Sequence, residues 1–182
     1  MSDFLKQVTE RTPLLADGAM GTVLHERGVA FARSFDELNL IDPQLVTSIH
    51  AEYIAAGAEI VMTNTFGANR FRLAEHGLEE QVAYINQRGV ELARAAAAEA
   101  DHPVWVAGDI GPLGVRLAPF GRVQPEDARA AFEEQIRGLL LGKPDLLLIE
   151  TMTDLYEARE AVLAAKALSE LPVLASMTFT RD

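Results

Sequence analysis

Short apolar segments alternate with longer amphipathic ones along the whole chain, and this alternation constrains the fold more than any other feature. The apolar segments are four to six residues long and show no alternation of apolar and polar side chains. Continuous apolar strands of this kind are typical of a parallel sheet that is covered on both faces. The sequence therefore predicts an α/β fold. The predicted strands are residues 14–17, 59–63, 104–107, 146–149 and 172–177.

The amphipathic segments between the strands carry the signals of helix ends. Asp42 and Pro43 combine an N-cap residue with a proline at the first helical position, and Gly57 is placed to end this helix. Further helices are predicted at residues 78–100, 125–141 and 154–168. The mixed charges of residues 69–80 predict a solvated helix face. The chain thus contains about five βα units in one domain, residues 1–182.

The length and charge of the chain exclude several classes of partner. With 182 residues, 49% of them hydrophobic, the chain can form one well-buried domain. Its net charge of -11 disfavours nucleic acid and anionic membranes, because both attract positive surfaces. No apolar run approaches the roughly 20 residues that cross a bilayer, and the amino terminus lacks the order of a signal peptide. We therefore expect a cytoplasmic protein with neither a nucleic-acid nor a membrane partner.

The sequence offers no catalytic nucleophile and no metal site. It contains no cysteine, which excludes thiol catalysis and thiolate metal sites within these residues. No serine stands in a G-x-S-x-G elbow, and no two histidines have the spacing of a metal site. We expect all four histidines at the surface, in loops or on helices: His25, His50, His76 and His102.

Polar residues at the strand ends are the candidates for a functional site, because the carboxyl ends of parallel strands form the active-site face of α/β proteins. Five βα units suit a flavodoxin-like open sheet, whereas a closed (β/α)₈ barrel needs eight strands and about 250 residues. The pattern alone leaves this choice open. The candidates are Asp17, Asn64, Thr65, Asp109, Glu150, Thr151 and Thr178.

Asp17 and Glu150 each admit a structural and a functional interpretation. Asp17 precedes Gly18 and could cap a turn, or contact a ligand where glycine lets the backbone come close. Glu150 ends the most hydrophobic strand, so its charge needs a cationic partner. That partner could be Arg70 or Arg116, or the ammonium group of a substrate. In a barrel, Asp17 and Glu150 could converge on one cation.

Five motifs at or near the strand ends resemble those of the homocysteine S-methyltransferase family. Each motif alone is weak, but their order is the family's order, and together they cover essentially the whole chain. The similarity is greatest to bacterial enzymes that fuse this module to methylenetetrahydrofolate reductase, and to the first domain of cobalamin-dependent methionine synthase. The motifs are LADGAMGT at 15–22, FDELN at 35–39, TNTFGAN at 63–69, GDIGPLG at 108–114 and LIETM at 148–152.

The resemblance implies a (β/α)₈ barrel that is incomplete in this chain. It also implies transfer of a methyl group to the sulfur of homocysteine to give methionine, with Zn²⁺ holding the sulfur as a thiolate. The family's zinc ligands are three cysteines, one after the sixth strand and two near the eighth, so none lies in this chain. The methyl donor is undetermined, since the family uses a folate through cobalamin, a methylated sulfonium or a betaine.

The same resemblance assigns the substrate pocket. Acidic residues matching Asp17 and Glu150 hold the substrate's amino group in the family. Asp109 is a departure, because relatives often have a small residue there, and an extra carboxylate would change the charge of the pocket. The predicted substrate-binding residues are Asp17, Gly18, Asn64, Thr65, Phe66, Asp109 and Glu150.

Two other hypotheses remain open at this point. A partial barrel would expose strand edges and an apolar interior, and such surfaces are normally covered. The chain could therefore be a complete, non-catalytic protein that self-associates through its barrel edges and at most binds an amino acid. Alternatively, Asp109 and Glu150 could be oxygen ligands for Mg²⁺ in an unrelated α/β enzyme.

Overall fold

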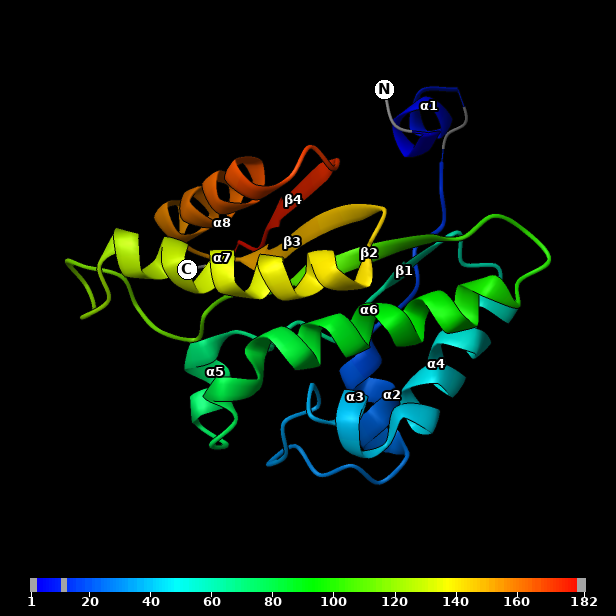
Figure 1. The fold of residues 1–182 in the computed structure, drawn as a ribbon, viewed down its shortest axis with the longest axis horizontal. Helices are drawn as coiled ribbons and strands as arrows, with labels where there is room; N and C mark the ends of the chain where they lie inside the picture. The colour runs from blue at the N-terminus through cyan, green and yellow to red at the C-terminus, as the bar shows by residue number, and fades with distance from the viewer. Residues whose placement is uncertain (1–2, 11–12, 180–182) are drawn as a thin grey trace.

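The centre of the fold is a sheet of four parallel strands that follow one another in sequence order (Figure 1). The structure, a computed structural model, describes residues 3–10 and 13–179. This sheet confirms the predicted α/β class and four of the predicted strands. The strands are β1 (Ile60–Met62), β2 (Trp105–Ile110), β3 (Leu146–Met152) and β4 (Val173–Met177).

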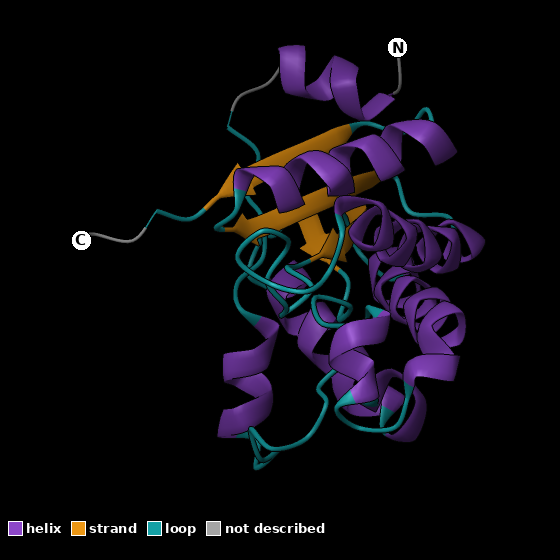
Figure 2. Cartoon of the chain, turned by 90° about the vertical axis from the view of Figure 1, so that its left-hand side faces the viewer, coloured by secondary structure: helices purple, strands orange, loops and turns teal. Residues whose placement is uncertain are grey.

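Four long helices cover one face of the sheet. Each packs against the next in the order α4, α6, α7, α8. Figure 2 shows the purple helices beside the orange strands. In the described part of the chain, no helix is long and apolar enough to cross a membrane. The helices are α4 (Pro43–Ala55), α6 (Val82–Ala98), α7 (Pro125–Gly142) and α8 (Leu155–Leu168).

Shorter helices fill the connections and the other face of the sheet. Helix α1 packs its Phe4 edge-on against Trp105 of β2, with 5.7 Å between the ring centroids. The Trp105 indole N–H donates to Gln7 of the same helix, over 3.1 Å. Helix α1 therefore covers the apolar start of β2 on the face away from α7. The short helices are α1 (Asp3–Glu10), α2 (Met20–Glu26), α3 (Leu38–Ile41), α5 (Arg70–Ala74) and the 3₁₀ helix η1 (Glu79–Gln81).

The strand predicted at residues 14–17 forms only a single parallel bridge, between Ala16 and Ile60 of β1. This corrects the expectation of five strands in the described residues. The segment lies where a further strand would pair with β1, and the Asp17 N–H donates to the Ile60 carbonyl over 2.9 Å. The pairing stops there because the chain turns at Gly18 and enters α2 at Met20.

The helix ends follow the predicted signals. The Asp42 carboxylate accepts the Leu45 N–H at the start of α4, over 3.2 Å. Gly57, just beyond the end of α4, has φ of +102°, a conformation that side chains other than glycine rarely adopt. The predicted helix at 78–100 begins instead as η1 and continues as α6.

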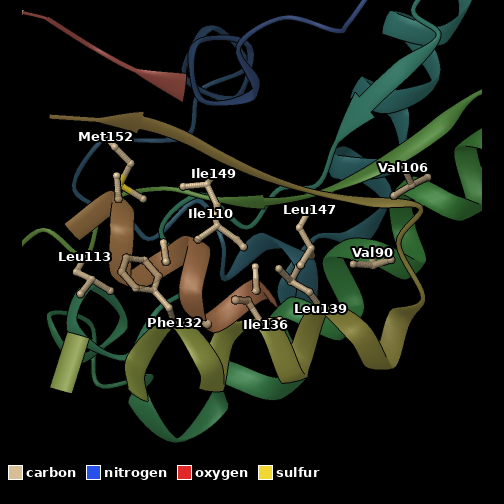
Figure 3. Close-up of a cluster of buried hydrophobic side chains, with 14 of the residues drawn as sticks. Val90, Val106, Ile110, Leu113, Phe132, Ile136, Leu139, Leu147, Ile149 and Met152 are labelled. Atoms are coloured by element: carbon tan, nitrogen blue, oxygen red, sulfur yellow. The ribbon is translucent and has the colours of Figure 1, made fainter. Parts of the chain in front are cut away.

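The main core lies between the sheet and helices α6 to α8 (Figure 3). There Phe132, Ile136 and Leu139 of α7 point toward Ile110 of β2 and Ile149 of β3, and all five side chains are fully buried. Successive residues of a strand point to opposite faces. The neighbours of Ile110 and Ile149, namely Asp109 and Glu150, therefore project to the face away from the helices.

Candidate functional site

A pocket of about 480 Å³ lies at the carboxyl ends of the strands. Its wall includes Met62 and the residues after it at the end of β1, Asp109 of β2, and Glu150 with Thr151 of β3. The other side of the pocket is formed by the start of α2, the segment before α3, and α5. Further residues that line the pocket are Gly18, Met20, Phe31, Arg33, Asp36, Phe66, Arg72 and His76.

Asp109 is the most deeply buried acid of the pocket, with 5% of its surface exposed. Both polar groups of its backbone, the N–H and the carbonyl, form hydrogen bonds with threonine hydroxyls. The N–H donates to the Thr63 hydroxyl over 2.9 Å, and the carbonyl accepts the Thr65 hydroxyl over 2.8 Å. Its Oδ1 atom is buried and has no hydrogen-bond partner in the described structure. A buried acceptor without a hydrogen bond costs free energy, and a ligand group that donates to Oδ1 would remove this cost.

Glu150 is half-buried in the same pocket. Of the two arginines considered as internal partners, Arg70 binds Glu134 through two hydrogen bonds of 2.6 and 2.9 Å. Neither Arg70 nor Arg116 forms an ion pair with Glu150 in the described residues. The salt-bridge interpretation is therefore wrong for these residues, and the carboxylate remains available to a ligand.

Asp17 is tied to the end of β1. Both of its carboxylate oxygens accept the Met62 N–H, over 3.0 and 3.2 Å. It does not line the pocket, although the charge of Glu150 acts on it and its own charge acts on Asp109. Asp17 therefore has a structural role, but by holding the end of β1 and not as the cap that its position before Gly18 suggested, and its effect on a ligand would be mainly electrostatic.

Burial and mutual repulsion raise the pKa values of this group of acids. Burial raises the pKa of Asp17 to about 7, and that of Asp36 to about 6. Burial, and then the charges of Glu150, Asp36 and Asp17, raise the pKa of Asp109 well above its usual value. Neighbouring carboxylates in a poorly hydrated site cannot all ionise. The pocket therefore retains protons near neutral pH, and an incoming cation would favour their release.

The predicted residues divide into those that line the pocket and those that support it. Gly18, Phe66, Asp109 and Glu150 line it, as does Asn64. The side-chain amide of Asn64, however, donates to the Phe35 carbonyl over 2.7 Å and so holds the segment before α3. Thr65 is fully buried and supports Asp109.

The predicted substrate-binding residues did not include two charged residues that the structure brings to the pocket, although Asp36 belongs to the motif at 35–39. Asp36 is buried, and its carboxylate accepts the Gly67 N–H over 2.9 Å. Arg72 lies in the segment predicted to be a solvated helix face, but it is half-buried and its Nε donates to the Pro112 carbonyl over 3.0 Å. On the five-residue helix α5, Arg72 lines the pocket, whereas Arg70 is exposed and pairs with Glu134.

The expectation of surface histidines is wrong for His50. Its side chain is fully buried on α4, and neither ring nitrogen has a hydrogen-bond partner in the described residues. Burial lowers its pKa to about 4, so the ring is neutral at neutral pH. His25 and His76 are exposed, as predicted, and His102 is half-buried against Asp101 and the Ala58 carbonyl.

The residues present do not fit a metal ion. Across residues 3–10 and 13–179, no group of three or more His, Asp or Glu side chains is placed to hold one. The whole sequence also lacks cysteine. Neither a thiolate zinc site nor the alternative Mg²⁺ site on Asp109 and Glu150 is therefore supported by these side chains.

Comparison with known proteins identifies relatives that match nearly the whole chain. It is 34% identical over 176 residues to the methionine synthase of Mycobacterium leprae (strain TN). The aligned region covers 91% of this chain and 14% of that protein. It is 33% identical over 193 residues to the methionine synthase of Mycobacterium tuberculosis (strain ATCC 25618 / H37Rv), covering 97% and 16% respectively. The chain thus spans only a small part of the curated relatives it matches.

The fold matches a solved enzyme of related sequence. The structure superposes on the oxidized form of the homocysteine methyltransferase MmuM from Escherichia coli with a TM-score of 0.81 and 28% identity. The match covers 93% of this chain and 63% of that one. The metallated form of MmuM gives a TM-score of 0.80 with the same identity.

The strand-end motifs and the comparisons lead to the same family. The family model described as homocysteine S-methyltransferase matches residues 14–182, which include all five motifs and every residue of the pocket described above. This confirms the resemblance seen in the sequence. The chain belongs to the homocysteine S-methyltransferase family.

Proposed function

We propose that residues 1–182 form the amino-terminal part of a (β/α)₈ barrel that binds homocysteine and methylates its sulfur to give methionine. One observation carries the proposal. Asp109 and Glu150 line the same pocket at the strand ends, Asp109 Oδ1 is buried without a hydrogen-bond partner, and neither carboxyl forms an ion pair in the described structure. An amino-acid ammonium group supplies the cationic donors that these two carboxyls lack.

The rest of the pocket would shape the space for the amino acid. The Phe66 ring lies directly on Gly111, where an added Cβ would stand 2.5 Å from the ring. Glycine at this position therefore lets Phe66 line the pocket. Gly18 borders the same space, where an added Cβ would lie 2.9 Å from the Tyr53 hydroxyl. Asp17 would add negative potential without contacting the ammonium.

Activation of the thiol is assigned to no residue of this chain. A free thiol has a pKa near 8.5, so it is mostly protonated at neutral pH. Zinc bound to the sulfur would supply the thiolate, but the side chains present do not fit the metal. We therefore propose a substrate-binding role for this chain and no catalytic residue within it. The methyl donor, whether a folate through cobalamin, a sulfonium or a betaine, is likewise assigned to no residue here.

We expect homocysteine binding near pH 7 to release protons, because the ammonium group would favour the ionised forms of Asp109 and Asp17. Isothermal titration calorimetry in two buffers of different ionisation enthalpy measures this release. The titration is run on residues 1–182 and on the chain extended to the natural end of its reading frame, together with zinc content. Absence of homocysteine binding by both proteins would overturn the proposal.

One observation favours self-association as a second property. Strand β4 is the last strand of the sheet, and its Leu174, Ala175 and Ser176 are all exposed. Exposed strand edges tend to pair with other chains. We expect residues 1–182 to elute as a dimer or larger species in size-exclusion chromatography with light scattering. A monomer at all concentrations would contradict this expectation.

A further inference from the structure

We propose that Gln135 is a positioning residue for substrate binding: from the far side of the sheet, it fixes the backbone of Asp109 so that the Asp109 carboxyl is held toward the ammonium group. This inference rests on the proposed function. It concerns a residue of α7 that does not line the pocket.

Gln135 is a polar exception on the apolar face of α7. Its neighbours Phe132, Ile136 and Leu139 are fully buried in the main core, and Gln135 is itself 0% exposed. Burying an amide among apolar side chains costs free energy unless hydrogen bonds compensate for the lost water. The hydrogen bonds that the Gln135 amide forms therefore indicate its role in the core.

The amide of Gln135 connects the ends of two neighbouring strands. Its Nε2 donates to the Thr65 carbonyl over 2.8 Å and, more weakly, to the Asp109 carbonyl over 3.5 Å. The regular pairing of β1 with β2 ends at Met62 and Ala107. The Asp109 peptide therefore lies beyond the reach of this strand pairing and needs other partners on the β1 side.

Two threonine hydroxyls complete the support. The Thr65 hydroxyl donates to the Asp109 carbonyl, and the Thr63 hydroxyl accepts the Asp109 N–H. The two hydroxyl oxygens are 2.6 Å apart. Because the Thr65 proton is used by the Asp109 carbonyl, Thr63 is the donor between them. Each member of this chain of hydrogen bonds thus has a defined direction, which favours a single position of the Asp109 backbone.

The network is costly in one respect, and this argues for a role beyond stability. The Gln135 Oε1 atom is buried without a partner in the described structure, as is Asp109 Oδ1. An amide that leaves one of its atoms unsatisfied adds little net stability. Its benefit is the placement of Asp109, in the way that supporting residues hold the groups that contact a ligand.

A double-mutant cycle on homocysteine binding tests this role. Gln135→Met keeps the length of the side chain and removes its donor. We expect it to weaken homocysteine binding by about 3- to 10-fold, the worth of a typical hydrogen bond. In the Asp109→Asn background, Gln135→Met should change the affinity by less than about 2-fold, because the carboxylate that it places is gone.

Two further variants separate positioning from folding. Thr65→Val removes the other donor to the Asp109 carbonyl and should show the same dependence on Asp109. Asn86→Leu removes a second buried amide, which donates to the Ala68 and Val82 carbonyls and to no member of the network. It should lower thermal stability and leave the affinity unchanged.

Equal losses from Gln135→Met in both backgrounds, or no loss in either, would overturn the positioning role. Failure of the wild type itself to bind homocysteine would instead overturn the proposed function.

Discussion

Glu150→Gln should weaken homocysteine binding by about 30- to 1000-fold, which corresponds to about 2–4 kcal/mol. The substitution keeps the shape of the side chain and removes its charge. Glu150 has no cationic partner in the described residues, so the ammonium group would lose its main ionic contact without a compensating gain. The affinity is measured by isothermal titration calorimetry at pH 7.5.

Glu134→Gln provides the matched control for this prediction. Glu134 lies on α7 outside the pocket and pairs with Arg70 at the surface, so the same change of charge should leave the affinity within about 2-fold of the wild type. Circular dichroism shows whether both variants fold. If Glu150→Gln and Glu134→Gln bound homocysteine equally well, Glu150 would not contact the ammonium group.

The sequence predicted the parts of the fold that depend on local signals. Four strands are short apolar runs, and the caps at Asp42 and Asp154 lie where side chains can bond the first free N–H groups of α4 and α8. Asp109 and Glu150 could be predicted as well, because parallel strands bring their carboxyl ends to one edge of a sheet. The predicted first strand, residues 14–17, was wrong, because the length of its pairing depends on how soon the chain turns into α2.

Residues placed by packing were harder to predict. Asp36 precedes a four-residue helix and follows no strand, so no periodicity places it beside Gly67. Gln135 lies on a helix face whose buried side is set by the sheet. His50 did carry a usable signal. It stands four residues after Val46 and one after Ile49, on the face that the helical spacing predicts to be buried.

Thermal stability should fall as pH rises from 6.5 to 8, and this is the second large effect that we expect. The pKa of Asp17 is raised by burial to about 7, and burial together with the neighbouring carboxylates raises that of Asp109 well above its usual value. The unfolded carboxyls lose their protons near pH 4. The folded state therefore binds more protons than the unfolded state over this range, and its stability decreases with pH.

Stability is compared above pH 6.5 so that the effect of these acids can be distinguished from that of His50, which acts mainly at lower pH. The pKa of His50 falls to about 4 on burial, whereas an unperturbed imidazole titrates at 6.5, so His50 makes stability rise with pH between those values. Asp36, with a pKa raised by burial to about 6, acts in the opposite direction over much of that interval. Above pH 6.5 the rise due to His50 levels off as the unfolded imidazole loses its remaining protons, so it offsets the decrease due to Asp17 and Asp109 less and less.

Asp17, with a pKa of about 7, should by itself lower stability by about 1 kcal/mol between pH 6.5 and 8, or about 2–4 °C in Tm for a chain of this size, and Asp109 should add to this decrease. Differential scanning fluorimetry at matched ionic strength measures it. Asp109→Asn replaces the acid by a neutral side chain of the same shape, so it should make the decrease smaller and raise Tm at pH 8. The same variant should bind homocysteine less well, because its amide cannot form an ion pair with ammonium. If Asp109→Asn and the wild type lost Tm equally with rising pH, Asp109 would not be the acid that retains its proton in the pocket.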